Sequence, residues 1–360
     1  MVRQIPIFTA VLTVGLLAGS ADALAQRNRK ATEEPKPQIL PLPPQLPMAL
    51  AADTATLDFH ISPLLRTGGL SAQIRQSLYD LIRDTRGETI IKLRAFVSGA
   101  GDARRVEATV GAVFRERKLP LPVLTIIQVG GLGQEAAQVV IEAVVATRHT
   151  VNPNGLAFLA GETGVSLTDA LARLKNSAGS ASVEPARVLT CTCFTSQIEN
   201  YDVARSAIQA VFPNTAITIV QPLRDPTSEF AMCEAIGQLS QPPAEGPVVW
   251  LKDARATLVN SHQLVFTGLQ LTFGNFLDDA HEAFARLERA ASALQPVEAP
   301  VEVNAFSLDA YAGSALRKSA SVPGSTFTVQ TVEGLPAIDA SAGIEAVLAP
   351  NVRSPVTIPR

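Results

Sequence analysis

Three glutamates that recur in one local pattern are the residues whose type best suits them to bind a small polar ligand. Each lies in a Glu-Ala pair within an apolar run, and the three are Glu142, Glu234 and Glu345. One threonine also recurs in each segment, at Thr125, Thr218 and Thr328. Carboxylates accept hydrogen bonds and hydroxyls donate or accept them, so this set predicts a binding site. Two alternatives stay open: the threonines reflect ordinary β-propensity, and the glutamates are structural partners of backbone or threonine groups.

Arg224 is the seventh candidate, because a guanidinium group binds carboxylates in a bidentate way. It lies in a turn beside Asp225, so a surface ion pair of small energy is the alternative. We expect no metal and no cofactor. The pattern that begins at His281 has Ala285 where a zinc-binding helix would place its second histidine.

These residues lie in a local pattern that occurs three times along the chain. Each copy has an amphipathic helix, a strand that ends in phenylalanine, a second helix, and closing strands that carry the Glu-Ala pair. The first helices are expected at 71–84, 166–177 and 277–294, and the second helices at 104–114, 201–212 and 309–319. The central strands are expected at 90–96, 188–194 and 301–306.

The repeat also predicts the domain organisation. Three segments are expected at 57–150, 151–242 and 246–350, the first with a shortened front and a tail at 351–360 after the last. Each segment is close to the roughly 100 residues of a common domain. The order of elements predicts an α+β layer with both helices on one face, and three sheets that pack inward with the helices outside.

The repeated pattern resembles the Rid (reactive intermediate deaminase, or YjgF) family. The second segment carries the resemblance most clearly, at 154–161, 188–194 and 232–235, and the whole resemblance covers 57–350. It implies an α+β fold of three tandem chorismate-mutase-like β-α-β-α-β repeats. These would form, within one monomeric chain, the trimer that family members build from three chains, with ligand clefts between repeats.

The resemblance also implies where catalytic residues should lie. Family deaminases hydrolyse enamines and imines with an arginine that holds the substrate carboxylate and a glutamate that positions water. The arginine position falls on Leu124, Ile217 and Phe327, and the glutamate position falls on Val140, Met232 and Gly343. None of these side chains can do that chemistry.

We therefore expect a non-catalytic protein that binds a small molecule, such as a small carboxylate or imine, or that serves as a scaffold. Two alternatives remain: an imine or enamine hydrolase with one degenerate cleft retained, and a structural module that binds a partner. Whether the chain is an enzyme stays open at this point.

Composition excludes several classes of protein. Hydrophobic residues make up 47% of the chain, which excludes disorder over its whole length. The 30 Lys and Arg against 33 Asp and Glu give a net charge of −3, so we expect no nucleic-acid partner. The long apolar run lies at the N-terminus, and we expect no membrane span.

The N-terminal run has the form of a secretory signal peptide over residues 1–25. Arg3 supplies the positive charge, Ile5 to Leu17 the apolar region, and Ala23-Leu24-Ala25 the cleavage pattern. This predicts a periplasmic or secreted protein, with an uncleaved anchor as the alternative. Residues 26–56 are rich in proline and are expected to form an extended linker.

Three cysteines follow the apolar run. Cys191 and Cys193 alternate along an expected strand and therefore face the same side. We expect a disulfide from one of these two to Cys233, and the sequence leaves open which one forms it.

Overall fold

The computed structural model describes residues 45–99, 103–251, 253, 255–274, 277–292, 297–320 and 326–350. The described residues belong to one compact unit. The expected signal peptide, the first part of the linker and the tail at 351–360 lie outside the described residues. The signal peptide and the periplasmic or secreted location therefore stay predictions.

The described residues contain six α-helices, and each begins within one residue of its expected start. They are α1 (Leu70–Asp84), α2 (Arg104–Glu116), α3 (Leu167–Ser180), α4 (Tyr201–Val211), α5 (Leu277–Ser292) and α6 (Ala310–Ser319). Two of these starts have side-chain caps. Ser166 accepts a hydrogen bond from the Asp169 backbone, and Asp309 accepts one from the Ala312 backbone. Within the described part of the chain, no helix has the length and apolar character needed to cross a membrane.

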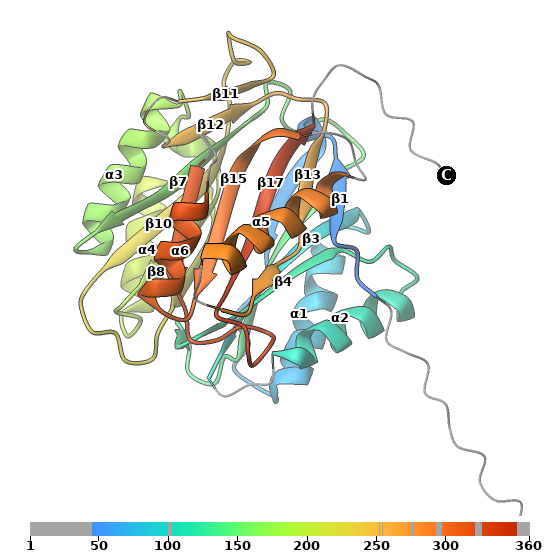
Figure 1. Cartoon of the computed structure of the whole chain (residues 1–360), viewed down its shortest axis with the longest axis vertical. Coiled ribbons are helices and arrows are strands. Elements are labelled where there is room, and N and C mark those ends of the chain that lie inside the picture. The colour runs from blue at the N-terminus through green and yellow to red at the C-terminus, as the bar shows by residue number, and fades with distance from the viewer. Residues whose placement is uncertain are drawn as a thin grey trace, which may run out of the picture. The chain divides into compact units, whose positions relative to one another are not determined.

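The strands form three sheets (Figure 1). Sheet I has the order β2-β6-β3-β4, with β2 (Leu57–Ile61), β6 (Val139–Ala146), β3 (Thr89–Ser98) and β4 (Val123–Val129). Sheet II has the order β11-β12-β7-β10-β8-β9-β5, with β11 (Val248–Trp250), β12 (Ala256–Val259), β7 (Leu156–Gly164), β10 (Ala231–Gln238), β8 (Val188–Thr195), β9 (Ala216–Gln221) and β5 (Gly131–Leu132). Sheet III has the order β1-β13-β17-β15-β16, with β1 (Ala49–Ala52), β13 (Leu264–Thr267), β17 (Ala342–Pro350), β15 (Val297–Ser307) and β16 (Thr326–Thr331), while β14 (Gln270–Thr272) pairs with β17.

The expected fold class, three small tandem Rid-like repeats that form a pseudo-trimer, is wrong. The sheets are mixed and contain four, seven and six strands. They also exchange strands: β1 pairs with β13, β5 pairs with β9, and β12 pairs with β7. An edge strand exposes unpaired backbone groups, and here distant segments cover such edges. The periodicity of one strand does not encode which distant segment pairs with it.

The expected linker at 26–56 is wrong at its C-terminal end. Residues Ala49–Ala52 form β1, which runs antiparallel to β13 and completes the edge of sheet III. The short 3₁₀ helix Thr54–Thr56 then leads into β2. The segment boundaries at 150 and 242 stay predictions.

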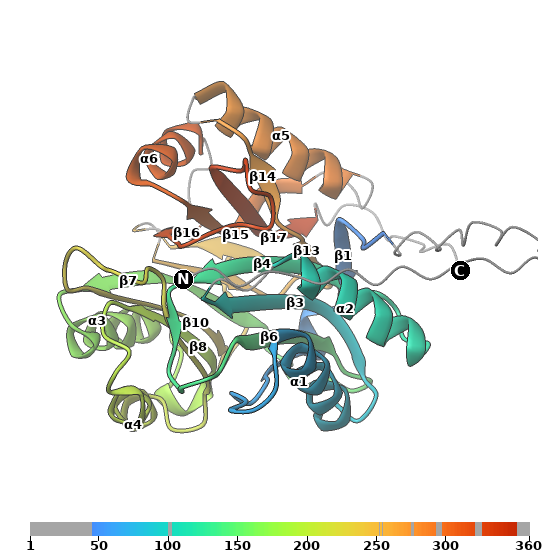
Figure 2. The same ribbon diagram turned by 90° about the horizontal axis from the view of Figure 1, so that it is seen from below.

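Each sheet carries two helices on its outer face, as Figure 2 shows for the pairs α1/α2, α3/α4 and α5/α6. A separate apolar cluster fills each of these interfaces. In the cluster of sheet II, Cys193 and Cys233 form a disulfide bond and Cys191 is a buried free thiol. These three sulfur positions lie on the helix side of the sheet.

The inner faces of the three sheets pack against one another. Phe96, Phe194 and Phe306, the phenylalanines near the ends of the central strands, belong to one buried cluster with members from all three sheets. A second cluster, which contains Leu57, Phe158 and Phe266, also draws on all three sheets. Burial of these apolar faces stabilises the sheets in contact.

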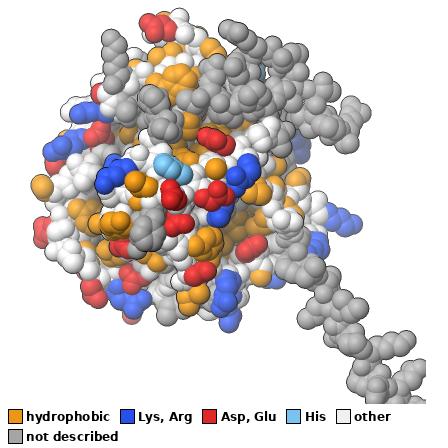
Figure 3. Space-filling model, in the orientation of Figure 1, with side chains coloured by type: hydrophobic (Ala, Val, Ile, Leu, Met, Phe, Trp, Pro, Cys, Tyr) orange, Lys and Arg blue, Asp and Glu red, His pale blue; other side chains and the backbone are white. Residues whose placement is uncertain are grey.

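The surface mixes charges of both signs. On the face in Figure 3, acidic, basic and apolar side chains lie intermingled around the region of α5 and α6. On α5, Glu282 forms ion pairs with Arg286 and Arg289. The expectation that the protein binds no nucleic acid stays a prediction.

Candidate active site in the central cavity

The repeated glutamates and threonines lie in three cross-strand rows, one in each sheet. The rows are Glu142–Arg94–Thr125 in sheet I, Glu234–Thr192–Thr218 in sheet II and Glu345–Asn304–Thr328 in sheet III. Residues directly opposite each other on neighbouring strands project from the same face of a sheet. The central strands β3, β8 and β15 thus bring one polar row from each sheet to the interior.

Arg94 joins all three rows. Its Nε donates a hydrogen bond to Glu345 at 2.8 Å, and its Nη1 donates to Glu234 at 2.9 Å and to Glu142 at 3.3 Å. The amide of Asn304, oriented so that both its ends have partners, accepts from Arg94 at 2.8 Å and donates to Glu234 at 3.2 Å. One guanidinium, with only 11% of its side chain exposed, therefore fixes the carboxylates of three sheets.

Glu345 lies on the closed side of this cluster. Its carboxylate contacts Lys92 Nζ at 2.8 Å and Arg94 Nη2 at 2.5 Å, and it accepts a hydrogen bond from the Thr125 hydroxyl. The Glu345 side chain is 1% exposed. Both oxygens of this carboxylate therefore have partners: Arg94 binds Oε1, and Lys92 and Thr125 bind Oε2.

The charges in the cluster shift its ionisation. Burial alone would lower the pKa of Arg94, but the negative charges of Glu345, Glu142 and Glu234 outweigh burial and raise it well above its ordinary value. Burial alone would raise the pKa of Glu345, but Arg94 and Lys92 outweigh burial and lower it to about 2. Both groups are therefore charged at neutral pH.

Glu302 lies on the open side, two residues before Asn304 on β15 and on the same face. Its side chain forms no hydrogen bond, and no ion pair within 4.0 Å, with any described residue, although the residue is only 7% exposed. Burial, together with the negative charge of Glu234, raises the pKa of Glu302 to about 8. Burial also raises the pKa of Glu234, and Arg94 offsets only part of this effect.

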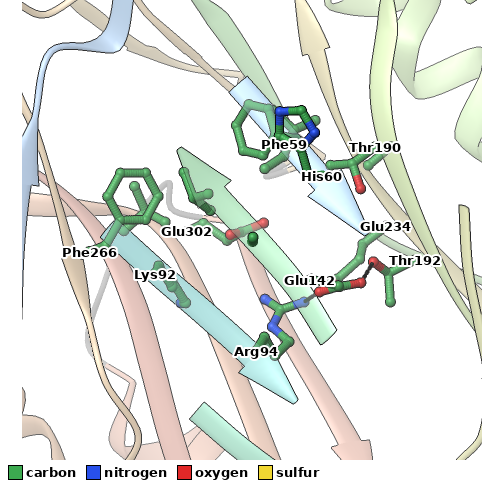
Figure 4. Close-up of a pocket in the computed structure, with 15 residues that line it drawn as sticks. Phe59, His60, Lys92, Arg94, Glu142, Thr190, Thr192, Glu234, Phe266 and Glu302 are labelled. Carbon is green, nitrogen blue, oxygen red and sulfur yellow. Dashed lines mark hydrogen bonds and ion pairs between the residues drawn. The ribbon is translucent and has the colours of Figure 1, made fainter. Parts of the chain in front are cut away.

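A cavity of about 60 Å³ lies between these groups. Figure 4 shows the carboxyl group of Glu302 near the middle of the labelled residues. The polar part of the lining consists of His60, Lys92, Arg94, Glu142, Thr190, Thr192, Glu234 and Glu302. The Thr192 hydroxyl donates to Glu142 at 2.6 Å, so this carboxylate is held by both a hydroxyl and a guanidinium.

Apolar side chains line the rest of the cavity. They include Phe59, Val144, Ile236, Phe266 and Val347. His60, partly exposed, lies beside Phe59 and contacts the Asp58 carboxylate at 3.1 Å. The cavity thus combines fixed carboxylates with an apolar wall, as small-molecule sites do.

The structure brings together four of the seven residues predicted from the sequence. Glu142, Glu234, Glu345 and Thr125 belong to the Arg94 cluster, and Glu142 and Glu234 line the cavity. Their role in ligand binding stays a prediction.

The other three predicted residues form no hydrogen bond or ion pair with Arg94. Thr328 accepts a hydrogen bond from the Gly161 backbone at 3.1 Å, which joins β16 to β7. The Thr218 hydroxyl is buried and has no hydrogen-bond partner among the described residues. Arg224 is exposed beside Glu333, whose carboxylate accepts from the Arg224 backbone at 3.0 Å.

Five residues of the site were not predicted from the sequence: Arg94, Lys92, Glu302, Thr192 and Asn304. A signal for them exists in two strands. Lys92 and Arg94 alternate with apolar residues, and so do Glu302 and Asn304. Alternating polar residues in otherwise apolar strands that are covered on both faces indicate a buried polar site.

No family model matches this chain, and no curated protein matches it. Similar solved structures include a chorismatase (13% identity, 82% of this chain and 99% of that chain, TM-score 0.26). A cyanuric acid hydrolase from A. caulinodans is 12% identical over 84% of this chain and 100% of that chain (TM-score 0.23). PurL from T. maritima, complexed with FGAR, is 10% identical over 81% of this chain and 72% of that chain (TM-score 0.27). At these TM-scores the likenesses carry no argument about function.

The identification as a Rid-family member is wrong. Neither a family model nor a curated protein supports it, and the similar structures over most of the chain include a chorismatase and cyanuric acid hydrolases. The functions that depended on it, a non-catalytic Rid-like binder or scaffold, an imine deaminase and a partner-binding module, are withdrawn with it. The identification depended on short apolar strands followed by phenylalanine, a local pattern that does not encode which distant segments pair with each strand.

The described residues offer one group of side chains close enough to hold a metal ion. The sulfur atoms of Cys191, Cys193 and Cys233 lie within 4.8 Å of one another, but two of them are joined in the disulfide. The carboxylates that line the cavity do not gather into such a group.

Proposed function

We propose that the central cavity is the active site of a hydrolase for small molecules, with Glu302 as the group that transfers the proton. One observation carries this proposal: the Glu302 carboxyl group is nine-tenths buried, lines the cavity and has no hydrogen-bond partner among the described residues. Buried carboxyl groups are almost always paired when their role is structural. A carboxyl group left open toward a cavity is available to a substrate and a water molecule.

The ionisation of Glu302 suits proton transfer near neutral pH. A pKa of about 8 leaves a minor ionised fraction at pH 7 and a major fraction above pH 8. The ionised carboxylate takes a proton from water as the water oxygen attacks the electrophilic carbon of the substrate. The same carboxyl group then gives that proton to the leaving nitrogen or oxygen as its bond to carbon breaks. Such acid–base catalysis works best when the pKa lies near the working pH.

The remaining polar groups orient the substrate. Arg94 and Thr192 hold Glu142 in place, and Arg94 and Asn304 hold Glu234. Each carboxylate oxygen has two lone pairs, so both groups can still accept N–H or O–H donors from a molecule in the cavity. Preorganised acceptors of this kind do not have to reorganise during the reaction.

Hydrolysis of a panel of small amides, amidines, guanidines and esters, followed by NMR, tests the proposal. We expect turnover of at least one compound and a loss of about 100-fold or more in kcat in Glu302→Gln. Glu184→Gln, at an exposed glutamate that does not line the cavity, is the control and should keep the activity. No turnover of any compound, or equal turnover by the Glu302→Gln variant, would overturn the proposal.

The pH profile supplies an independent readout. Because the base must be ionised, kcat/KM should rise by about tenfold per pH unit up to pH 8 and level off above it. A profile that levels off near pH 5 would indicate a carboxylate with an ordinary pKa and would contradict the role of Glu302.

A further inference from the structure

We propose that this cavity takes a small planar cation of the amidinium or guanidinium class. As a statement about substrate, this inference rests on the proposed function. As a statement about binding, it stands on the charges and walls of the cavity.

The cavity and its immediate support contain two more carboxyl groups than fixed cations. The carboxyl groups are Glu142, Glu234, Glu302 and Glu345, and the cations are Lys92 and Arg94. Both cations already contact Glu345. If all four carboxyl groups ionise, buried negative charge is left uncompensated, which is costly, and a bound cation would relieve this cost.

The geometry places the unmatched charge at the cavity. Glu345 is enclosed by Lys92, Arg94 and Thr125, whereas both oxygens of Glu302 lack partners among the described residues. Glu234 has Arg94 on one oxygen and Asn304 on the other. A ligand with positive charge and N–H donors would therefore bind first to Glu302.

A planar organic cation fits the walls better than a metal ion. In the described cavity, the carboxylate oxygens are not gathered closely enough to form a metal site. Phe59 and Phe266 are among the lining residues, and aromatic faces attract organic cations. Two parallel N–H groups of an amidinium match the two oxygens of a carboxylate.

The cavity also limits the size of the ligand. Its volume of about 60 Å³ is small against the roughly 300–1,000 Å³ of common ligand sites, which favours a small ligand. Acetamidinium and guanidinium, each with four non-hydrogen atoms, are small members of this class.

An isosteric series separates charge from shape. Acetamidinium, acetamide and acetate have nearly the same shape and differ in charge, and acetamidinium stays protonated between pH 6 and 9. By isothermal titration calorimetry of the full-length protein at pH 8, we expect acetamidinium to bind at least tenfold more tightly than acetamide, with no binding of acetate. Equal or tighter binding of acetamide or acetate would overturn the proposal.

Proton release provides a readout on the unmodified protein. The charged groups that face Glu302 are Glu234 on β10, Lys92 and Arg94 on β3, and Glu345 on β17, with Glu142 and His60 also on the cavity wall. Because the cation needs ionised Glu302, binding at pH 7 should release close to one proton, measured in buffers of different ionisation enthalpy. The release should fall toward zero at pH 9, and affinity should rise by more than tenfold from pH 6.5 to pH 8. Binding without proton release at pH 7 would overturn the proposal.

Variants complete the test. Glu302→Gln should lose at least tenfold in affinity for acetamidinium and should release no proton, whereas Glu184→Gln should bind as the unmodified protein does. Acetamidinium binding with no hydrolysis of the panel would support this proposal and overturn the proposed function. Hydrolysis of neutral compounds with no acetamidinium binding would overturn this proposal and leave the proposed function intact.

Discussion

On the two sides of the central cluster, the pKa values of two buried carboxyl groups shift in opposite directions. Glu345 is enclosed by Lys92, Arg94 and the Thr125 hydroxyl, and its pKa falls to about 2. Glu302 lines the cavity beside this cluster and has no such partner, and its pKa rises to about 8. The two residues have the same chemistry and similar burial, so the difference arises from their partners.

This difference separates a structural function from a chemical one. A carboxylate that stays charged at all ordinary pH values can hold three sheets together through Arg94 but cannot exchange a proton near pH 7. A carboxyl group that titrates near neutral pH can exchange one, at a cost to stability where it ionises. Groups with pKa values moved apart by their surroundings are a common feature of acid–base active sites.

Replacement of the shared guanidinium should give the largest effect on stability. In Arg94→Met, Glu142, Glu234 and Glu345 lose their common partner while they stay buried. We expect a loss of about 3–5 kcal/mol in the free energy of unfolding, measured by urea denaturation at pH 7. Arg224→Met, at an exposed ion pair with Glu333, is the control and should change stability by less than about 0.5 kcal/mol. Similar losses in the two variants would show that Arg94 has no special structural role.

The two carboxyl groups should also give opposite effects of pH on stability. The folded-state pKa of Glu302 lies above the unfolded value of 4.5, so the folded state binds more protons and stability falls as pH rises from about 4.5 to 8. The folded-state pKa of Glu345 lies below 4.5, so its contribution is lost as pH falls from 4.5 toward 2.

Melting temperatures between pH 4.5 and 9 test the first half of this difference. Glu302→Gln resembles the protonated side chain, so its melting temperature should be close to that of the unmodified protein at pH 5 and higher at pH 8. If the difference in melting temperature between the two proteins is the same at every pH, the raised folded-state pKa of Glu302 is contradicted.

Two buried threonines make a smaller matched pair. Thr125→Val removes the hydroxyl that donates to Glu345, and we expect a loss of about 1–3 kcal/mol. Thr218→Val removes a hydroxyl without a partner among the described residues, so stability should stay equal or rise slightly. Urea denaturation of both variants measures the difference, and a larger loss in Thr218→Val would contradict the described network.

Local elements could be predicted from the sequence, and long-range pairings could not. The six helix starts follow from apolar periodicity and, at Ser166 and Asp309, from capping side chains. The pairing of β1 with β13 joins residues more than 200 positions apart, and no local pattern encodes it. The Rid-like fold class was wrong for the same reason, because it left out these long-range strand pairings.

The candidate site could be predicted in part for a similar reason. The glutamates recur in three segments, so their repetition revealed them, whereas Arg94 occurs in one segment and has Thr192 and Asn304 at the corresponding positions of the other two sheets. A search for repetition therefore passes over the residue that joins the rows. Glu302 lacks a repeated counterpart as well, and its open carboxyl group becomes visible only when the three sheets are assembled.

The pKa of Glu302, measured by ¹³C NMR of the protein labelled at its glutamate carboxyl carbons, tests the central claim most directly. The resonance that disappears in Glu302→Gln should titrate with a midpoint near pH 8, and acetamidinium should move that midpoint to lower pH. A midpoint near 4.5, unchanged by acetamidinium, would contradict an open carboxyl group poised for proton transfer.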